Sequence, residues 1–216
     1  MTEDESFPLD KPISNDNEVT VMCREHERIS SLYLQDQEMG EKIIQLLVLV
    51  LSVGATLLIG LYQIINDIEI FLWISLGCIS IILFLGLMTF QRLVKRHIRC
   101  TEYLRAINKI HCFFSLKFPS LKEHFYWLPC KDEPHFLRNS TMSVGLKRIA
   151  SLINSIIFAI LVCISLYIIY IYIPAQNKLL FIIIAIIGII SFFSAFFLHR
   201  KYENAVFGRA EEESKG

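Results

Sequence analysis

Five histidine and cysteine residues between positions 111 and 135 have the greatest capacity for chemistry in this chain. They are His111, Cys112, His124, Cys130 and His135. Imidazole and thiolate groups bind zinc, but their spacing here matches no zinc-site pattern. We therefore expect no metal site and no cofactor. The chain also lacks a serine elbow, a phosphate-binding loop and an HExxH motif, so we expect no enzymatic activity.

A second group of polar residues lies within the apolar run 43–66. Its members, Gln45, Ser52, Thr56 and Gln63, stand at 0, 7, 11 and 18 residues from the first. At about 100° per residue they fall within roughly 20° of one line, and the line is about 27 Å long on a helix. Two interpretations stay open: a pore-lining face in an oligomer, or interhelical hydrogen bonds in the core of a bundle.

Two further candidates for the same pore-lining or helix-packing roles lie in the apolar run 150–177. Asn154 and Ser165 are 11 residues apart and repeat part of the spacing of the first run. Because uncharged polar residues are rare inside membrane spans, their placement is informative.

The stretch EYLRAINKIHCFF, residues 102–114, combines basic and aromatic residues with helical spacing. No Gly or Pro occurs between Met88 and Phe114, so we expect the preceding helix to continue through it. Its apolar stripe for another helix consists of Tyr103, Ile107, Ile110 and Phe114. Arg99, Arg105 and Lys109 point elsewhere and are candidates for docking a partner or lipid headgroups.

Apolar runs define the elements that must position these residues. The chain has 216 residues, 54% hydrophobic and 19% charged, with a mean hydropathy of +0.49. Asp, Glu, Lys and Arg are absent from 43–66, 70–91, 150–177 and 179–198. Each run is about 20 residues or longer, which is the length that a helix needs to cross a bilayer. The sequence predicts an all-α membrane protein with four transmembrane helices arranged as two hairpins.

The expected organisation follows from these runs and from the polar segments between them. It comprises a disordered acidic tail at 1–17, an amphipathic cytoplasmic helix at 18–42, spans at 43–66, 68–90, 151–174 and 179–198, a basic cytoplasmic helix and aromatic loop at 91–149, and a cytoplasmic tail at 199–216.

The distribution of basic residues predicts the orientation. Residues 91–151 carry twelve Lys and Arg against four Asp and Glu. Basic connecting segments stay on the cytoplasmic side, so both termini are expected there as well. The cysteines outside the spans are then expected to be reduced. Residues 1–42 carry eleven acids against four bases, so this arm either forms a separate solvated face or docks on the basic segment.

The run REHERISSLYLQDQEMGEKIIQLLVLVLSVGATLLIGL, a polar helix leading into a glycine-containing span, resembles the opening of many small multi-pass bacterial inner-membrane proteins. The segment EYLRAINKI, followed by aromatics and a Pro-bounded loop, is similar to their middle segment. Some of these proteins resemble transmembrane effectors of anti-phage defence systems of the retron or Kiwa type. The resemblance implies a small inner-membrane protein that permeabilises the membrane when triggered, and it implies no catalytic residues.

Three functions are weighed from the sequence. The leading expectation is an oligomeric inner-membrane effector that disrupts the membrane, as in abortive infection. The alternatives are a non-conducting membrane adaptor or sensor that recruits a cytosolic partner, and a small transporter. The absence of Asp, Glu, Lys and Arg from the apolar runs argues against the transporter. The expected partners are the lipid bilayer, further copies of this chain and a cytosolic protein or trigger; a nucleic acid is not expected.

Overall fold

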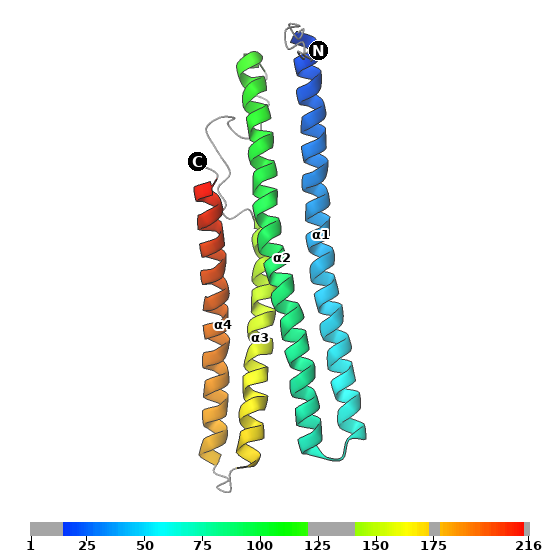
Figure 1. The fold of residues 1–216 in the computed structure, drawn as a ribbon, viewed down its shortest axis with the longest axis vertical. Helices are drawn as coiled ribbons and strands as arrows, with labels where there is room; N and C mark the ends of the chain where they lie inside the picture. The colour runs from blue at the N-terminus through cyan, green and yellow to red at the C-terminus, as the bar shows by residue number, and fades with distance from the viewer. Residues whose placement is uncertain (1–14, 121–140, 173–177, 214–216) are drawn as a thin grey trace, which may run out of the picture. The chain divides into compact units, whose positions relative to one another are not determined.

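The computed structural model describes residues 15–120, 141–172 and 178–213, and nearly all of these residues lie in helices (Figure 1). The helices are α1 Asn15–Ile64, α2 Ile68–Lys117, α3 Thr141–Ile171 and α4 Lys178–Glu213. Each contains a segment that is long and apolar enough to cross a membrane. The chain is therefore an all-α, multi-pass membrane protein, which confirms the predicted all-α class and the four candidate spans. The arrangement of the spans as two hairpins stays a prediction.

Helices α1 and α2 are each 50 residues long, whereas a span needs only about 20. Helix α1 begins at Asn15 and runs without a break into its apolar segment. Helix α2 continues past its apolar segment and ends two residues before Pro119. This end follows from the sequence, because the residue before a proline is disfavoured in helical conformation.

Asp67 sets the start of α2 after the short connection from α1. The backbone amide of Glu69 donates to Asp67 Oδ1 at 2.9 Å, which is the usual hydrogen bond of an N-cap aspartate. The carboxylate also lies where the partial positive charge of the helix N-terminus favours an anion. Asp67 thus caps the first turn of α2.

The chain divides into two compact units. The small unit contains the described residues 15–34 and 103–120. The large unit contains 35–102, 141–172 and 178–213.

An apolar seam between the first part of α1 and the last part of α2 holds the small unit together. Its buried residues are Ile29, Ile107 and Ile110, with Met22, Tyr103, Ala106 and Phe114 packed against them. An ion pair of 2.8 Å joins Lys117 Nζ to Glu18. The helix that meets the apolar stripe of residues 103–114 is therefore the amphipathic N-terminal helix, and this ion pair joins the acidic arm to the basic segment.

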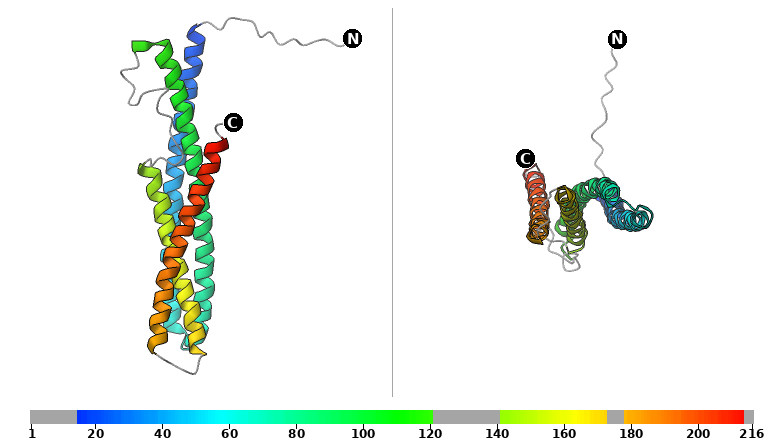
Figure 2. Two further views of the ribbon diagram at one scale, coloured as in Figure 1. Left: turned by 90° about the vertical axis from the view of Figure 1, so that its left-hand side faces the viewer. Right: turned by 90° about the horizontal axis from the view of Figure 1, so that it is seen from below.

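Within the large unit the helices follow one another in the order α4, α3, α2, α1, as the view from below shows (Figure 2). A layer of buried side chains joins all four helices: Ile44, Phe90, Leu93, Val94, Ala150 and Phe207. Of the most apolar window of α1 only 6% is buried, against 17–22% for the other three helices. Helix α1 is thus the least covered of the four spans.

Asp36 and Arg96 connect α1 to α2 where the apolar segments begin and end. The buried guanidinium of Arg96 donates from Nε to the backbone carbonyl of Asp36. Arg99 Nε lies 3.1 Å from the Asp36 carboxylate. A Cβ atom at position 40 would overlap the Arg96 guanidinium, so Gly40 provides the space through which this side chain crosses α1.

Lys147 and Glu203 make the corresponding connection between α3 and α4. Lys147 Nζ lies 2.6 Å from Glu203 Oε1, and the lysine residue is only 2% exposed. Its ammonium group also lies 4.2 Å from the centroid of the Phe207 ring, a distance suited to a cation–π interaction. A buried charge of this kind requires its partner, since an unpaired ammonium at low dielectric is very costly.

Gly86 permits close packing of α2 on α3. A Cβ atom at this position would overlap Oδ1 of Asn154, whereas at Gly77 on the same helix it would meet nothing within 4 Å. Asn154 is short and fully buried, so it has little freedom to move aside.

We predict that Gly86→Ala destabilises the protein and that Gly77→Ala does not. Both changes add the same methyl group to α2 and raise its helix propensity by about 0.5–1 kcal/mol. Only the first also overpacks the α2–α3 contact, at a cost of about 1–3 kcal/mol. Thermal unfolding of the two purified variants in one detergent measures the difference. Equal unfolding temperatures would contradict the described α2–α3 packing.

Candidate functional site

All four residues of the predicted stripe on α1 are exposed on the surface of this single chain: Gln45, Ser52, Thr56 and Gln63. Their apolar neighbours on α1 are exposed as well, for example Leu49 and Val53. The structure thus keeps the stripe together on one helix and leaves it uncovered by the other described helices.

The hydroxyl groups of the stripe are satisfied within α1. Ser52 Oγ donates to the carbonyl of Val48 at 2.9 Å, and Thr56 Oγ1 donates to that of Ser52 at 2.9 Å. The side-chain amides of Gln45 and Gln63 form no such bond to any described residue, and both lie near the ends of the apolar run. In a membrane these two amides are the groups of the stripe that still require a partner.

Asn154 and Ser165 on α3 do not extend this stripe. Ser165 is half-buried and its hydroxyl donates to Leu161 at 2.8 Å. Asn154 is 0% exposed and packs against Gly86 of α2. Of the two roles considered for Asn154, its position inside the large unit supports helix packing rather than a place on the exposed surface.

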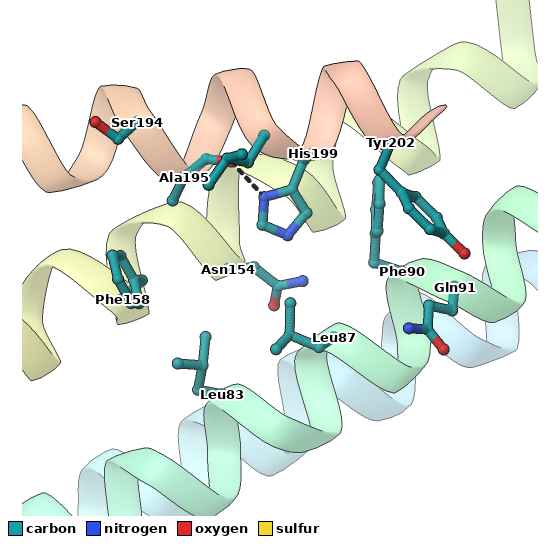
Figure 3. A pocket seen from close by; sticks show the side chains of 11 residues that line it. Leu83, Leu87, Phe90, Gln91, Asn154, Phe158, Ser194, Ala195, His199 and Tyr202 are labelled. Atoms are coloured by element: carbon teal, nitrogen blue, oxygen red, sulfur yellow. Dashed lines mark hydrogen bonds between the residues drawn. The ribbon is translucent and has the colours of Figure 1, made fainter. Parts of the chain in front are cut away.

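Asn154 lies at the wall of a pocket of about 490 Å³ between α2, α3 and α4. Figure 3 shows its amide pointing into the same space as the His199 imidazole, with Leu83 and Leu87 opposite. Neither amide atom of Asn154 has a hydrogen-bond partner among the described residues, and neither does His199 Nε2. The structure therefore combines an apolar pocket with buried, unsatisfied polar atoms.

The three basic docking candidates differ in their surroundings. Arg99 contacts Asp36 of the same chain, with Nε and Nη2 at 3.1 and 3.4 Å from the carboxylate oxygens. Arg105 is half-buried and Lys109 is exposed. The contact made by Arg99 gives that residue an internal role, and docking through Arg105 and Lys109 stays a prediction.

A pair of histidines lies on the small unit. His26 Nε2 of α1 and His111 Nε2 of α2 are 3.1 Å apart, and the ring centroids are 5.1 Å apart. One ring must donate and the other accept, so only one of the two Nε2 atoms carries a proton. Burial, and then the neighbouring His26, lower the pKa of His111 below its ordinary value. The Glu25–Arg28 ion pair lies one turn or less from His26 along α1.

The remaining metal-capable residues give no site that can be described. His124, Cys130 and His135 lie outside the described residues, and so do most residues of the expected aromatic loop. Among the residues that are described, no group of three or more His, Cys, Asp or Glu side chains could hold a metal ion.

The cysteines depart from expectation at one position. Cys23, Cys78, Cys100 and Cys163 are free thiols, but Cys112 is disulfide-bonded. The expectation that all cysteines outside the spans are reduced is therefore wrong for Cys112. A disulfide is typical of an oxidising compartment, so this one observation runs against a cytoplasmic position for the end of α2.

Sequence reasoning missed Arg96, Lys147 and His199 as functional or structural polar residues. All three flank apolar runs. Their position beside an apolar run could have indicated a role in the structure, because polar groups near a membrane span are buried only together with partners. The role of Gly86 had no such signal, since it depends on the side chain of α3 that faces it.

No known family model, no curated protein and no solved structure matches this chain.

We predict that acidification loosens the pairing of α1 and α2 in the small unit. Because the folded pKa of His111 lies below its ordinary value of 6.5, the unpaired state binds more protons as the pH falls. The stability of the pairing is thus present at neutral pH and decreases as the pH falls from about 6.5 toward the folded pKa.

Hydrogen exchange at two pH values, corrected for intrinsic rates, measures this effect in residues 18–34 and 103–116. Exchange should rise severalfold at the lower pH in the wild-type protein and much less in His111→Gln. The matching control is the α3–α4 pair, whose exchange should change little. A pH dependence that persists undiminished in His111→Gln would contradict the assignment to this residue.

Proposed function

We propose that this multi-pass membrane protein is a homo-oligomeric effector that permeabilises the membrane when triggered. The observation that carries the proposal is the uncovered polar stripe of Gln45, Ser52, Thr56 and Gln63 on α1. It lies on the span with the smallest buried share of the four.

The energetics of the stripe favour a partner over lipid. An unsatisfied polar group in hydrocarbon costs several kcal/mol. An interhelical hydrogen bond returns about 0.6 kcal/mol on average, and contact with water satisfies the group fully. A second copy of α1 offers both solutions, because copies can pair their glutamine amides or surround a narrow aqueous path about 27 Å long.

The small unit is the proposed receiver of the trigger. Its two helices are joined by one apolar seam, the Glu18–Lys117 ion pair and the histidine pair. Lys109 is exposed beside this seam, and a cytosolic partner with acidic groups could engage it. An adaptor function would use the same surface without any conduction, so the experiments below include it as an outcome.

The proposed location is a bacterial inner membrane with both termini in the cytoplasm. The excess of basic residues in 91–151 supports this orientation, and the disulfide at Cys112 opposes it. The proposed occasion is phage infection, with abortive infection as the result. The resemblance to transmembrane effectors of anti-phage systems is the support for that setting. We propose no enzymatic activity.

We predict that Ser52→Leu abolishes permeabilisation and that Ser80→Leu does not. Both serines are exposed, and each hydroxyl donates to the carbonyl four residues earlier, at 2.9 and 2.7 Å. The two changes are therefore matched in chemistry, but only Ser52 belongs to the stripe. The measurement is the membrane potential and the entry of a membrane-impermeant dye in cells that express each variant.

Two results would contradict the proposal. If cells that produce the wild-type protein keep their potential, both on overexpression and on phage challenge, permeabilisation fails as a function. A cytosolic protein that co-purifies stoichiometrically and is lost on Lys109→Glu would then support the adaptor. If Ser52→Leu and Ser80→Leu leak equally, the stripe is not the conducting surface.

We also predict that reporters fused to either terminus are on the cytoplasmic side. A fluorescent protein fused after Gly216 should be fluorescent, and alkaline phosphatase at the same position should be inactive. The phosphatase should become active when it is inserted after Asn66, in the connection between α1 and α2. The reverse pattern would overturn the orientation and would agree with the Cys112 disulfide.

A further inference from the structure

The pocket between α2, α3 and α4 is the cavity in which buried polar atoms are left without partners (Figure 3). Its volume of about 490 Å³ falls within the usual range for small-molecule sites, which are mostly apolar with a few convergent polar groups. Leu83, Leu87, Phe158 and Leu198 form much of its apolar wall. Leu198 is 65% exposed, so the pocket is open to the surroundings of the helices.

Asn154 is the first polar group of the pocket. It is 0% exposed, and neither its Nδ2 nor its Oδ1 atom has a hydrogen-bond partner among the described residues. Leaving an amide unsatisfied at such depth is costly, so the amide indicates an occupant of the pocket.

His199 is the second polar group, and its hydrogen bonding defines what it offers. Nδ1 lies 2.6 Å from the carbonyl oxygen of Ala195. A carbonyl only accepts, so Nδ1 carries the proton, and Nε2 of the neutral ring presents a lone pair. This Nε2 atom is buried and has no partner in the described part of the chain. The pocket thus offers one acceptor from His199 and a donor with an acceptor from Asn154.

We propose that this pocket binds an uncharged, lipid-soluble molecule through a hydroxyl group. The hydroxyl donates its proton to His199 Nε2 and accepts a hydrogen bond from Asn154 Nδ2, while the apolar remainder lies along Leu83 and Phe158. None of the described residues that line the pocket is Asp, Glu, Lys or Arg, so a charged ligand would lack a counter-ion. This binding is independent of the permeabilisation proposed above.

The position of the two polar groups fits a ligand that enters from the membrane. Asn154 stands near the start of the apolar run 150–177, and His199 directly follows the run 179–198. Gln91 and Tyr202 line the same end of the pocket, and Leu83 and Phe158 lie further into the apolar runs. A lipid hydroxyl stays near the headgroup level with its apolar part in hydrocarbon. Diacylglycerol and a quinol are two membrane-resident sources of this chemistry.

The test uses the full chain in lipid nanodiscs and two matched ligand pairs. The first pair is 1,2-dioleoylglycerol and its 3-acetyl ester; the second is a short-tailed ubiquinol and the corresponding quinone. Each pair differs in the hydroxyl donor and little in size. We expect one alcohol to bind about tenfold more tightly than its partner, the usual effect of leaving one buried acceptor unpaired. Native mass spectrometry and the shift in unfolding temperature both report binding.

Variants assign the effect to the pocket. Asn154→Leu should remove the preference for the alcohol, and so should His199→Phe. Ser155→Ala is the matched control, because Ser155 is equally buried but its hydroxyl already donates to Ser151 at 2.8 Å. The pair that shows the preference identifies the source of the hydroxyl.

Several outcomes would overturn the proposal. Equal binding within both pairs would show that no hydroxyl is recognised. Binding of neither pair would show that water alone satisfies Asn154 and His199. A preference that survives in both folded variants would place the site elsewhere.

Discussion

Hydrocarbon offers no hydrogen bonds, so every polar group in the spans must find a partner within the protein, from another copy or from a ligand. Four of the described serines meet this demand locally, whereas Ser75 Oγ is buried without a partner among the described residues. Ser52, Ser80, Ser155 and Ser165 each donate to the carbonyl four residues earlier in their own helix. The amide side chains of Gln45, Gln63 and Asn154 have no comparable internal solution. The architecture leaves the two glutamines on the outside of α1 and the asparagine inside the large unit, and these two placements lead to the two proposed sites.

The charged groups at the ends of the spans are arranged by the same constraint. Arg96 and Lys147 are buried where apolar runs begin or end, and each meets an oxygen of a neighbouring helix: the Asp36 carbonyl and the Glu203 carboxylate. Neither oxygen would be within reach if the facing helix were moved by one turn. The connections α1–α2 and α3–α4 are thus defined by directional contacts, in a setting where apolar contact alone does not distinguish protein from lipid.

Sequence periodicity was sufficient to predict the helices, but it could not predict which helices pack against one another. The lengths of the charge-free runs predicted four spans, and the absence of Gly and Pro after Met88 predicted that α2 would continue beyond its span, as it does to Lys117. The apolar stripe from Tyr103 to Phe114 was recognisable because helical spacing is a local property. Contacts between helices depend on which helix lies opposite. Examples are the cover that Met22 and Ile29 give to this stripe, the contact of Gly86 with Asn154 and that of Arg99 with Asp36. One sequence without that knowledge cannot specify it.

The contact between Gly86 and Asn154 has a consequence for the alignment of the helices. One turn away along α2, the amide would meet Leu83 or Phe90 in place of a bare Cα. Such a shift would replace a fitting contact by a steric clash. A small residue that faces a buried polar one therefore fixes the position of α3 along α2.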